Sequence, residues 1–217
     1  GEMLFLSAEG RHGAIDHTKG KWSCYRSFFH FASQKHVYEL DFYVLTSYEQ
    51  TENNSLLYLM ESKTLGEVYL PTPVSEEEES LLTAFAERAE AANTQVHLYG
   101  DEIFSLGELS LQSLSLHKNR LTSAAGFSIT YGDHELLFFS PTFQYEPSFY
   151  FRMQSADAVC FGARGGEECE PVFPSILSLG DVACFGSDEN KTPFKNTDGY
   201  LVVDTHTLQW KASKNEN

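Results

Sequence analysis

The feature that most constrains the fold of this chain is an alternation of strand-like and helix-like segments over its first hundred residues. Two short apolar stretches, residues 3–7 and 13–15, flank a turn-like segment at 8–11 and predict a β-hairpin. Apolar residues then recur at helical spacing through 22–36, which predicts an amphipathic helix. The chain therefore begins with antiparallel strands followed by a helix.

The alternation continues with two more strands and another helix. An apolar run at 40–46 predicts a buried strand, and the polar stretch 47–54 follows it as a loop. Leucines from 56 to 59 predict a helix, and residues 67–71 predict a strand that ends at a proline. Strands that alternate with helices in this way indicate an α/β fold with right-handed crossovers.

A third helix begins at the sequence Ser75-Glu76-Glu77-Glu78. This is a capping box, in which the Ser75 hydroxyl accepts a backbone hydrogen bond while Glu78 reaches back to the helix start. The helix dipole favours anions there, so the acidic run is interpreted as a helix start and not as a metal site. The helix is expected to end near Asn93, and a strand is expected at 95–99.

Beyond residue 100 the pattern changes to short strands. Strands are expected at 108–114, 126–131 and 135–139, the last two joined as a hairpin, with a loop at 116–125. Segments 157–162 and 181–186 resemble each other and predict two similar buried strands around a helix at 174–179. A terminal hairpin is expected from 200–203 and 207–210, followed by a polar tail at 211–217.

Composition limits the classes of protein that this chain can represent. Its 217 residues carry 15 Lys and Arg against 31 Asp and Glu, a formal net charge of −16, and 41% of them are hydrophobic. The size and hydrophobic content predict one folded domain over residues 1–217. The negative field opposes DNA and anionic membranes, so strong nucleic-acid binding and membrane insertion by this segment are not expected.

Two further features concern the origin of the chain. Its four cysteines, Cys24, Cys160, Cys169 and Cys184, form no C-x-x-C pair and are interpreted as reduced thiols, with Cys160 and Cys184 at equivalent positions of two strands. The chain opens with Gly1-Glu2-Met3 and lacks an apolar run long enough to span a membrane. We expect a soluble segment excised from a larger protein.

The order of these segments resembles the metallo-β-lactamase fold, and more narrowly the soluble domain of ComEC-type competence proteins, which take DNA into bacteria. Most of the resemblance lies in residues 40–71, where a Tyr-Val-Leu-Thr strand, a polar loop, a Leu-Leu helix and a strand ending in Leu-Pro follow one another. It continues through 96–101, Leu106-Gly107, Tyr131-Gly132 and 197–199. The resemblance implies an αββα sandwich, that is, mixed sheets flanked by helices.

The resemblance also locates the metal ligands of the fold, and this chain departs from them. The active loop reads His-x-His-x-Asp-His, because two divalent metals need imidazole nitrogens and a carboxylate converging from one rigid loop. The corresponding residues here are Ser47, Glu49, Thr51 and Glu52, the later bridging aspartate corresponds to Ser140, and the His-His-Gly turn corresponds to Ala163 and Arg164. The resemblance thus implies a degenerate site with no catalytic residue, no metal ligand and no cofactor.

Two alternatives stay open. Glu49 and Glu52 could hold a hard cation such as magnesium or calcium, which would give a metal-dependent phosphodiesterase with atypical ligands; solvated loop glutamates are the favoured interpretation. The glycine-rich turn with Arg164, Gly165 and Gly166 could bind a phosphate or carboxylate, which would make the domain a small-anion sensor. A turn that glycine simply permits is favoured there.

The function that these observations favour is a non-catalytic domain of a ComEC-like membrane protein, with a structural or interaction role in DNA uptake. The acidic surface favours a protein partner, or other parts of the parent membrane protein, over nucleic acid.

Overall fold

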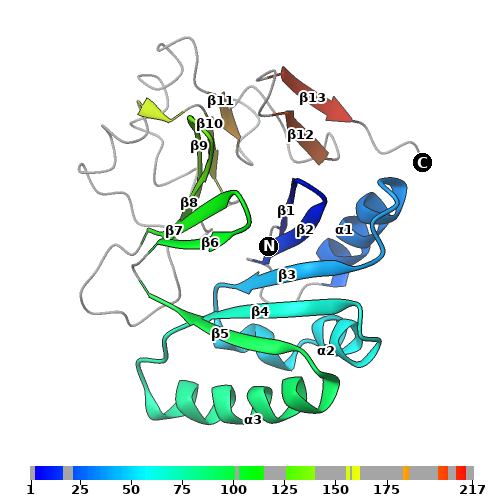
Figure 1. Cartoon of the computed structure of the whole chain (residues 1–217), viewed down its shortest axis with the longest axis vertical. Helices are drawn as coiled ribbons and strands as arrows, with labels where there is room; N and C mark the ends of the chain where they lie inside the picture. The colour runs from blue at the N-terminus through cyan, green and yellow to red at the C-terminus, as the bar shows by residue number, and fades with distance from the viewer. Residues whose placement is uncertain are drawn as a thin grey trace. The chain divides into compact units, whose positions relative to one another are not determined.

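The computed structural model describes residues 3–16, 22–100, 103–114, 126–139, 155–156, 158–161, 183–185, 200–204 and 209–213 (Figure 1). The chain forms two compact units. Unit 1 comprises residues 1–108 and 117–124, and unit 2 comprises residues 109–116 and 125–217. Within the described residues, no helix is both long and apolar enough to span a membrane.

A five-stranded mixed sheet forms the centre of unit 1, in the order β1-β2-β3-β4-β5. The first pair is antiparallel, and β2 to β5 are parallel to one another. The strands are β1 (Met3–Ala8), β2 (Arg11–Asp16), β3 (Leu40–Leu45), β4 (Leu65–Pro71) and β5 (Gln95–Tyr99). The hairpin and the parallel strands predicted from the alternating pattern are therefore confirmed.

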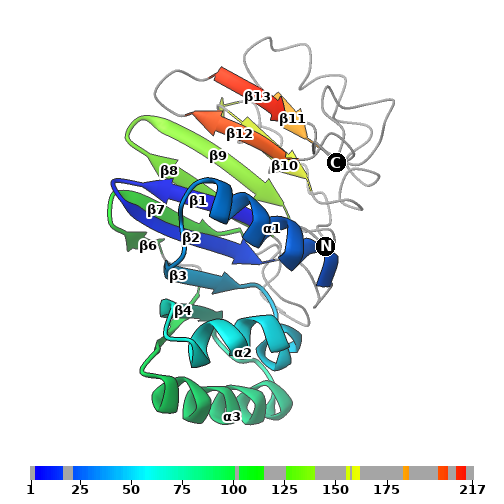
Figure 2. The same cartoon turned by 90° about the vertical axis from the view of Figure 1, so that its right-hand side faces the viewer.

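Helices connect these strands. They are α1 (Trp22–Gln34), α2 (Asn54–Glu61) and α3 (Glu76–Ala92), and the 3₁₀ helix η1 (Tyr48–Glu52) follows β3. Figure 2 shows α2 and α3 on the same side of β4. The polar segment between β3 and α2, which the sequence predicts to be a loop, is thus partly helical. The Gln50 side chain within it accepts a hydrogen bond from the backbone N–H of Thr46, which stabilises this turn.

The ends of α3 follow from local chemistry. The Ser75 hydroxyl accepts from the backbone N–H of Glu78 at 3.2 Å, as the capping box predicts. The Glu78 carboxylate accepts from the N–H of Val74 at 2.8 Å, one residue before the position expected for a capping box. Asn93 ends the helix in the left-handed conformation, with φ of 61°.

The core of unit 1 lies between the sheet and its helices. Tyr43 and Leu45 of β3 and Val68 and Leu70 of β4 are fully buried and alternate along their strands, so they share one face of the sheet. The helices supply the other side of this core through Tyr25, Leu56, Leu59, Met60, Phe85 and Ala89. Burial of these apolar side chains is the main stabilising contribution to unit 1.

The second sheet has the strand order β11-β10-β9-β8-β7-β6. Its strands are β6 (Ile103–Leu106), β7 (Leu109–Ser113), β8 (Gly126–Tyr131), β9 (His134–Phe139), β10 (Ala158–Phe161) and β11 (Ala183–Phe185), and β12 (Tyr200–Asp204) pairs with β13 (Gln209–Ser213) in a separate hairpin. The pattern missed β6 as a separate strand, and it placed the start of the final polar tail inside β13.

The two similar segments predicted to be buried strands contain β10 and β11, which are neighbours in the sheet and pair in parallel. Their register places Cys160 opposite Phe185, and Cys184 opposite Val159, so the two cysteines are offset by one position. The loop expected at 116–125 and the helix expected at 174–179 lie outside the described residues.

Candidate functional site

The candidate site is the edge of the unit 1 sheet at which the parallel strands end. Because β2, β3, β4 and β5 run in the same direction, their carboxyl ends meet at this edge. Open α/β sheets bind ligands at the carboxyl ends of their strands. The segment between β3 and α2, which the resemblance matches to the metal-binding loop, begins here.

The side chain of Gln50 organises this segment. Its amide oxygen accepts from the backbone N–H of Thr46 at 2.9 Å and of Ser47 at 3.0 Å. Its amide nitrogen donates to the backbone oxygen of Asp16 at 2.8 Å and to the Asp16 carboxylate at 3.1 Å. Gln50 is 1% exposed, so the segment after β3 is fastened to the end of β2 by a buried amide.

Asp16 is a fully buried carboxylate that receives hydrogen bonds from two phenols. The Tyr43 hydroxyl donates to Asp16 Oδ2 at 2.9 Å, and the Tyr25 hydroxyl donates to the same oxygen. Burial raises the pKa of Tyr43 well above its usual value of 10, and the negative charge of Asp16 adds to this shift. Tyr43 therefore remains a protonated donor at neutral pH.

Further tyrosines connect the segment to the neighbouring strands. Tyr48 donates its hydroxyl to the backbone oxygen of Pro71 at 2.5 Å, and Tyr99 donates to that of Leu45 at 2.7 Å. Burial raises the pKa of Tyr48 to about 12, with a smaller contribution from the charge of Glu78. The carboxyl ends of β3, β4 and β5 are thus cross-linked by side chain to backbone hydrogen bonds.

The structure places only some of the residues that the resemblance matched to metal ligands. Ser47 donates its N–H to Gln50, and the buried Thr51 donates its hydroxyl to the backbone oxygen of Tyr48 at 2.7 Å. Glu52 is exposed, and Glu49 lies within η1. The remaining positions lie outside the described residues: Ser140, Ala163, Arg164, Gly165 and Gly166.

Sequence reasoning missed the residues that organise this edge. The sequence pattern places Gln50 in a polar loop and does not link Asp16 to Tyr25 or Tyr43. A signal was present, because Asp16 closes the otherwise apolar strand Ala14-Ile15-Asp16, and a charge at the end of a buried strand needs partners. Those partners come from β3, η1 and α1, so the register of the strands and the position of the helices had to be known first.

The described residues of this edge do not fit a two-metal centre. Such a centre needs imidazole nitrogens and free carboxylates, whereas the Gln50 amide and the Asp16 carboxylate are engaged with protein partners. Across the described part of the chain, no group of three or more His, Cys, Asp and Glu side chains is arranged to hold a metal ion.

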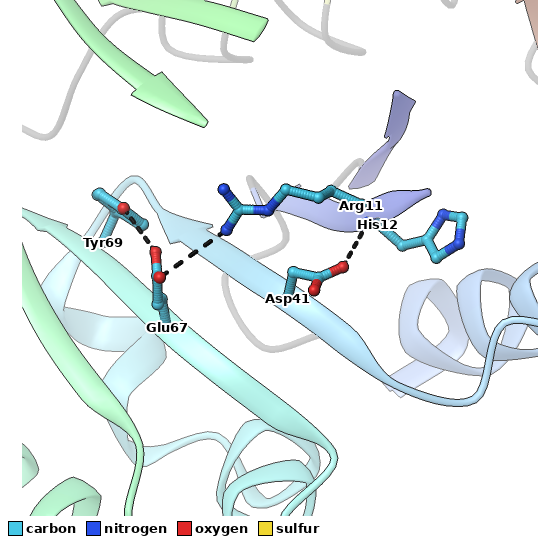
Figure 3. A network of polar contacts seen from close by, with 5 residues as sticks. All are labelled: Arg11, His12, Asp41, Glu67 and Tyr69. Atoms are coloured by element: carbon cyan, nitrogen blue, oxygen red, sulfur yellow. Dashed lines mark hydrogen bonds and ion pairs between the residues drawn. The ribbon is translucent and has the colours of Figure 1, made fainter. Parts of the chain in front are cut away.

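A second polar network lies on unit 1 strands (Figure 3). Arg11 of β2 lies 3.8 Å from the carboxylate of Glu67, which also accepts from the Tyr69 hydroxyl at 2.7 Å. The His12 N–H donates to Asp41 at 2.7 Å. Burial raises the pKa of Tyr69, and the hydrogen bond from Tyr69 to Glu67 makes a smaller contribution in the same direction. These contacts join β2 to β3 and β4, and we assign them a structural role.

Comparison with known proteins shows the fold. The sequence matches no protein-family model and no curated protein. Among solved structures, Zn²⁺-bound PqqB from Methylobacterium extorquens is 16% identical with a TM-score of 0.55, over 95% of this chain and 68% of that chain. A variant of the CmlA β-hydroxylase is 18% identical with a TM-score of 0.52, over 83% of this chain and 40% of that chain.

The match to CmlA covers only part of the CmlA chain. CmlA itself, a diiron β-hydroxylase from Streptomyces venezuelae, is 16% identical with a TM-score of 0.49, and the match spans 39% of its chain. The present chain thus spans about two fifths of the hydroxylase. At these identities the similarity concerns the fold alone. The chain has the mixed α/β metallo-β-lactamase fold, as the order of its segments predicted.

Proposed function

We propose that this chain is a non-catalytic metallo-β-lactamase-like domain with a structural or interaction role. The observation that carries the proposal is the buried Gln50 amide, which occupies the segment that the resemblance matches to the metal-binding loop. In an active member this segment presents histidines and an aspartate to two metals. Here it presents its polar groups to the protein itself.

The Asp16 carboxylate supports the same proposal. Its two oxygens accept from Gln50, Tyr25 and Tyr43 in a site with no exposed surface. Ligation of a metal by Asp16 would require the loss of these hydrogen bonds and would leave buried donors unpaired, at a cost of roughly 1–3 kcal/mol for each group. The network favours the protein-only arrangement.

The biological setting proposed for the domain is a ComEC-like membrane protein of bacterial DNA uptake. Support comes from the sequence resemblance over residues 40–71 and from the segments that continue it. The net charge of −16 favours contact with a protein, or with other parts of the parent protein, over contact with DNA. Deletion of this segment in frame from the chromosomal gene should lower DNA uptake; unchanged uptake would contradict this setting.

Metal retention tests the non-catalytic assignment. The protein is incubated with zinc, manganese or magnesium, desalted and analysed for metal, and hydrolysis of bis(p-nitrophenyl) phosphate is measured in parallel. We expect no stoichiometric metal and no hydrolysis, with an active metallo-β-lactamase-fold phosphodiesterase as the positive control. About two retained ions per chain with hydrolysis would overturn the proposal.

Substitutions at Glu49, Glu52 and Arg164 distinguish the two alternatives, through metal retention for the first and thermal unfolding for the second. Magnesium that is retained by the wild type but lost in Glu49→Gln and Glu52→Gln would favour the atypical phosphodiesterase. A phosphate-dependent rise in melting temperature that Arg164→Ala abolishes would favour the anion sensor. We expect neither result.

A further inference from the structure

Strand β5 forms an outer edge of the unit 1 sheet. The strand order ends at β5, and the described residues place no strand beyond it. In Figure 1, β5 has β4 on one side, and α3 runs alongside it. Edge strands carry backbone N–H and C=O groups that can pair with another chain, so this edge can accept a further strand.

One hydrogen bond identifies which backbone groups of β5 point outward. The N–H of Thr72 donates to the backbone oxygen of Tyr99 at 2.8 Å, so the C=O of Tyr99 faces β4. Backbone groups of successive residues alternate between the two sides of a strand. The N–H and C=O groups of Val96 and Leu98 therefore point away from β4, where no described residue pairs with them.

The residues of β5 include none of the side chains that usually protect an edge strand against pairing. In natural proteins, charged side chains, proline residues or bulges on edge strands prevent them from pairing with another chain. The β5 sequence Gln95-Val96-His97-Leu98-Tyr99 contains no Lys, Arg, Asp, Glu, Pro or Gly. In addition, Leu98 is 49% exposed, which leaves apolar surface beside the outward backbone groups. A strand added here would cover Leu98 with one of its own side chains.

The charge around β5 indicates which strand would fit. Helix α3 contacts β5, and its exposed acidic residues are Glu76, Glu77, Glu79, Glu87 and Glu90. The only basic residue of α3 is Arg88. By contrast, α1, which contacts the opposite edge strand β1, contains no acidic residue. The field at β5 therefore favours a positively charged segment.

We propose that the outer edge of β5 binds an extended, Lys/Arg-rich segment of a protein partner as an added strand. This inference rests on the proposed interaction role, for which it names the surface and the partner chemistry. Main-chain hydrogen bonds to Val96 and Leu98 supply the pairing, as in other strand-addition complexes. The acidic helix supplies the preference for a basic segment.

Peptide binding tests the proposal directly. The probe is a fluorescein-labelled nine-residue peptide with two lysines at each end and alternating valine and lysine between them, and the matched control replaces every lysine with glutamate. Fluorescence anisotropy should report binding of the basic peptide, no binding of the acidic one, and weaker binding as NaCl is raised from 50 to 500 mM. Absence of binding by the basic peptide, or equal binding of both peptides, overturns the proposal.

Two sets of variants locate the site. Leu98→Pro removes the outward N–H but leaves the hydrogen bonds to β4, so it should weaken binding by about tenfold or more. Leu98→Val keeps the N–H and should bind nearly as well as wild type. If Leu98→Pro fails to fold, Glu87→Gln with Glu90→Gln on α3 provides the second test and should weaken binding at low salt. Unchanged affinity of a folded Leu98→Pro variant, or of the Glu87→Gln, Glu90→Gln variant at low salt, overturns the proposal.

The oligomeric state and the metal assay separate the remaining outcomes. A dimer of this chain that Leu98→Pro dissociates would identify a second copy of the chain as the occupant of the β5 edge. That result would overturn the proposal that a basic segment of another protein binds there. Metal retention is measured on the same protein without peptide. If the wild-type protein neither binds the basic peptide nor retains metal, this inference alone is overturned. If it retains metal and hydrolyses the substrate, the proposed function is overturned.

Discussion

At the scale of single residues, Gln50 makes four hydrogen bonds through one buried amide. Substitution by alanine would leave two backbone N–H groups and the Asp16 oxygens without this partner. We expect Gln50→Ala to lower the free energy of unfolding by roughly 3 kcal/mol, because buried unpaired polar groups are costly. Urea unfolding measures this loss. Glu52→Ala, in the same 3₁₀ helix but exposed, should change stability by less than about 0.5 kcal/mol.

Tyr48 gives a pH-dependent prediction at the same scale. Its pKa is raised from 10 to about 12 in the folded protein. The protonated phenol therefore stabilises the fold fully below pH 10, and this stabilisation is lost as the pH rises from 10 through 12. In Tyr48→Phe, the decline of unfolding free energy over that window should be shallower. The exposed Tyr58→Phe is the control, and an equal change in its slope would contradict the assignment.

At the scale of secondary-structure elements, the pairing of β2 with β3 depends on a glycine. Gly13 lies opposite Phe42 in the register, and a Cβ added to Gly13 would lie 2.3 Å from the Phe42 ring. Phe42 is fully buried, so its ring has no open space into which it can move. We expect Gly13→Ala to destabilise the protein by at least about 2 kcal/mol, measured by denaturant unfolding. Gly100→Ala, with no atom within 4 Å of the added Cβ, should be nearly neutral.

At the scale of the whole molecule, the net charge of −16 governs which partners can approach. Non-specific DNA binding depends on basic side chains that replace counterions on the phosphates, and this chain has 15 of them against 31 acidic residues. We expect no change in the anisotropy of a labelled 30-base-pair duplex at 150 mM salt with up to about 100 μM protein, a concentration at which ordinary non-specific binders respond. Saturable binding would contradict the preference for a protein partner.

The sequence by itself determined the elements of unit 1 and their order. Apolar periodicity, the Ser75 cap and the Asn93 stop act over a few residues, so the alternation of strands and helices, and from it the fold class, could be predicted locally. The sequence also identifies positions 47, 49, 51 and 52 as those that correspond to the metal-binding loop of the resembled fold, because that correspondence depends on residue identity.

Only the tertiary structure decided what holds the carboxyl edge of the sheet together. Gln50 lies 34 residues from Asp16 in the chain, and Tyr25 and Tyr43 reach the same carboxylate from a helix and another strand. Such contacts depend on the register of β2 against β3, which no local pattern encodes. The edge position of β5 is likewise a property of strand order, because the pairing of strands, rather than the sequence of one strand, determines which backbone groups remain on the outside.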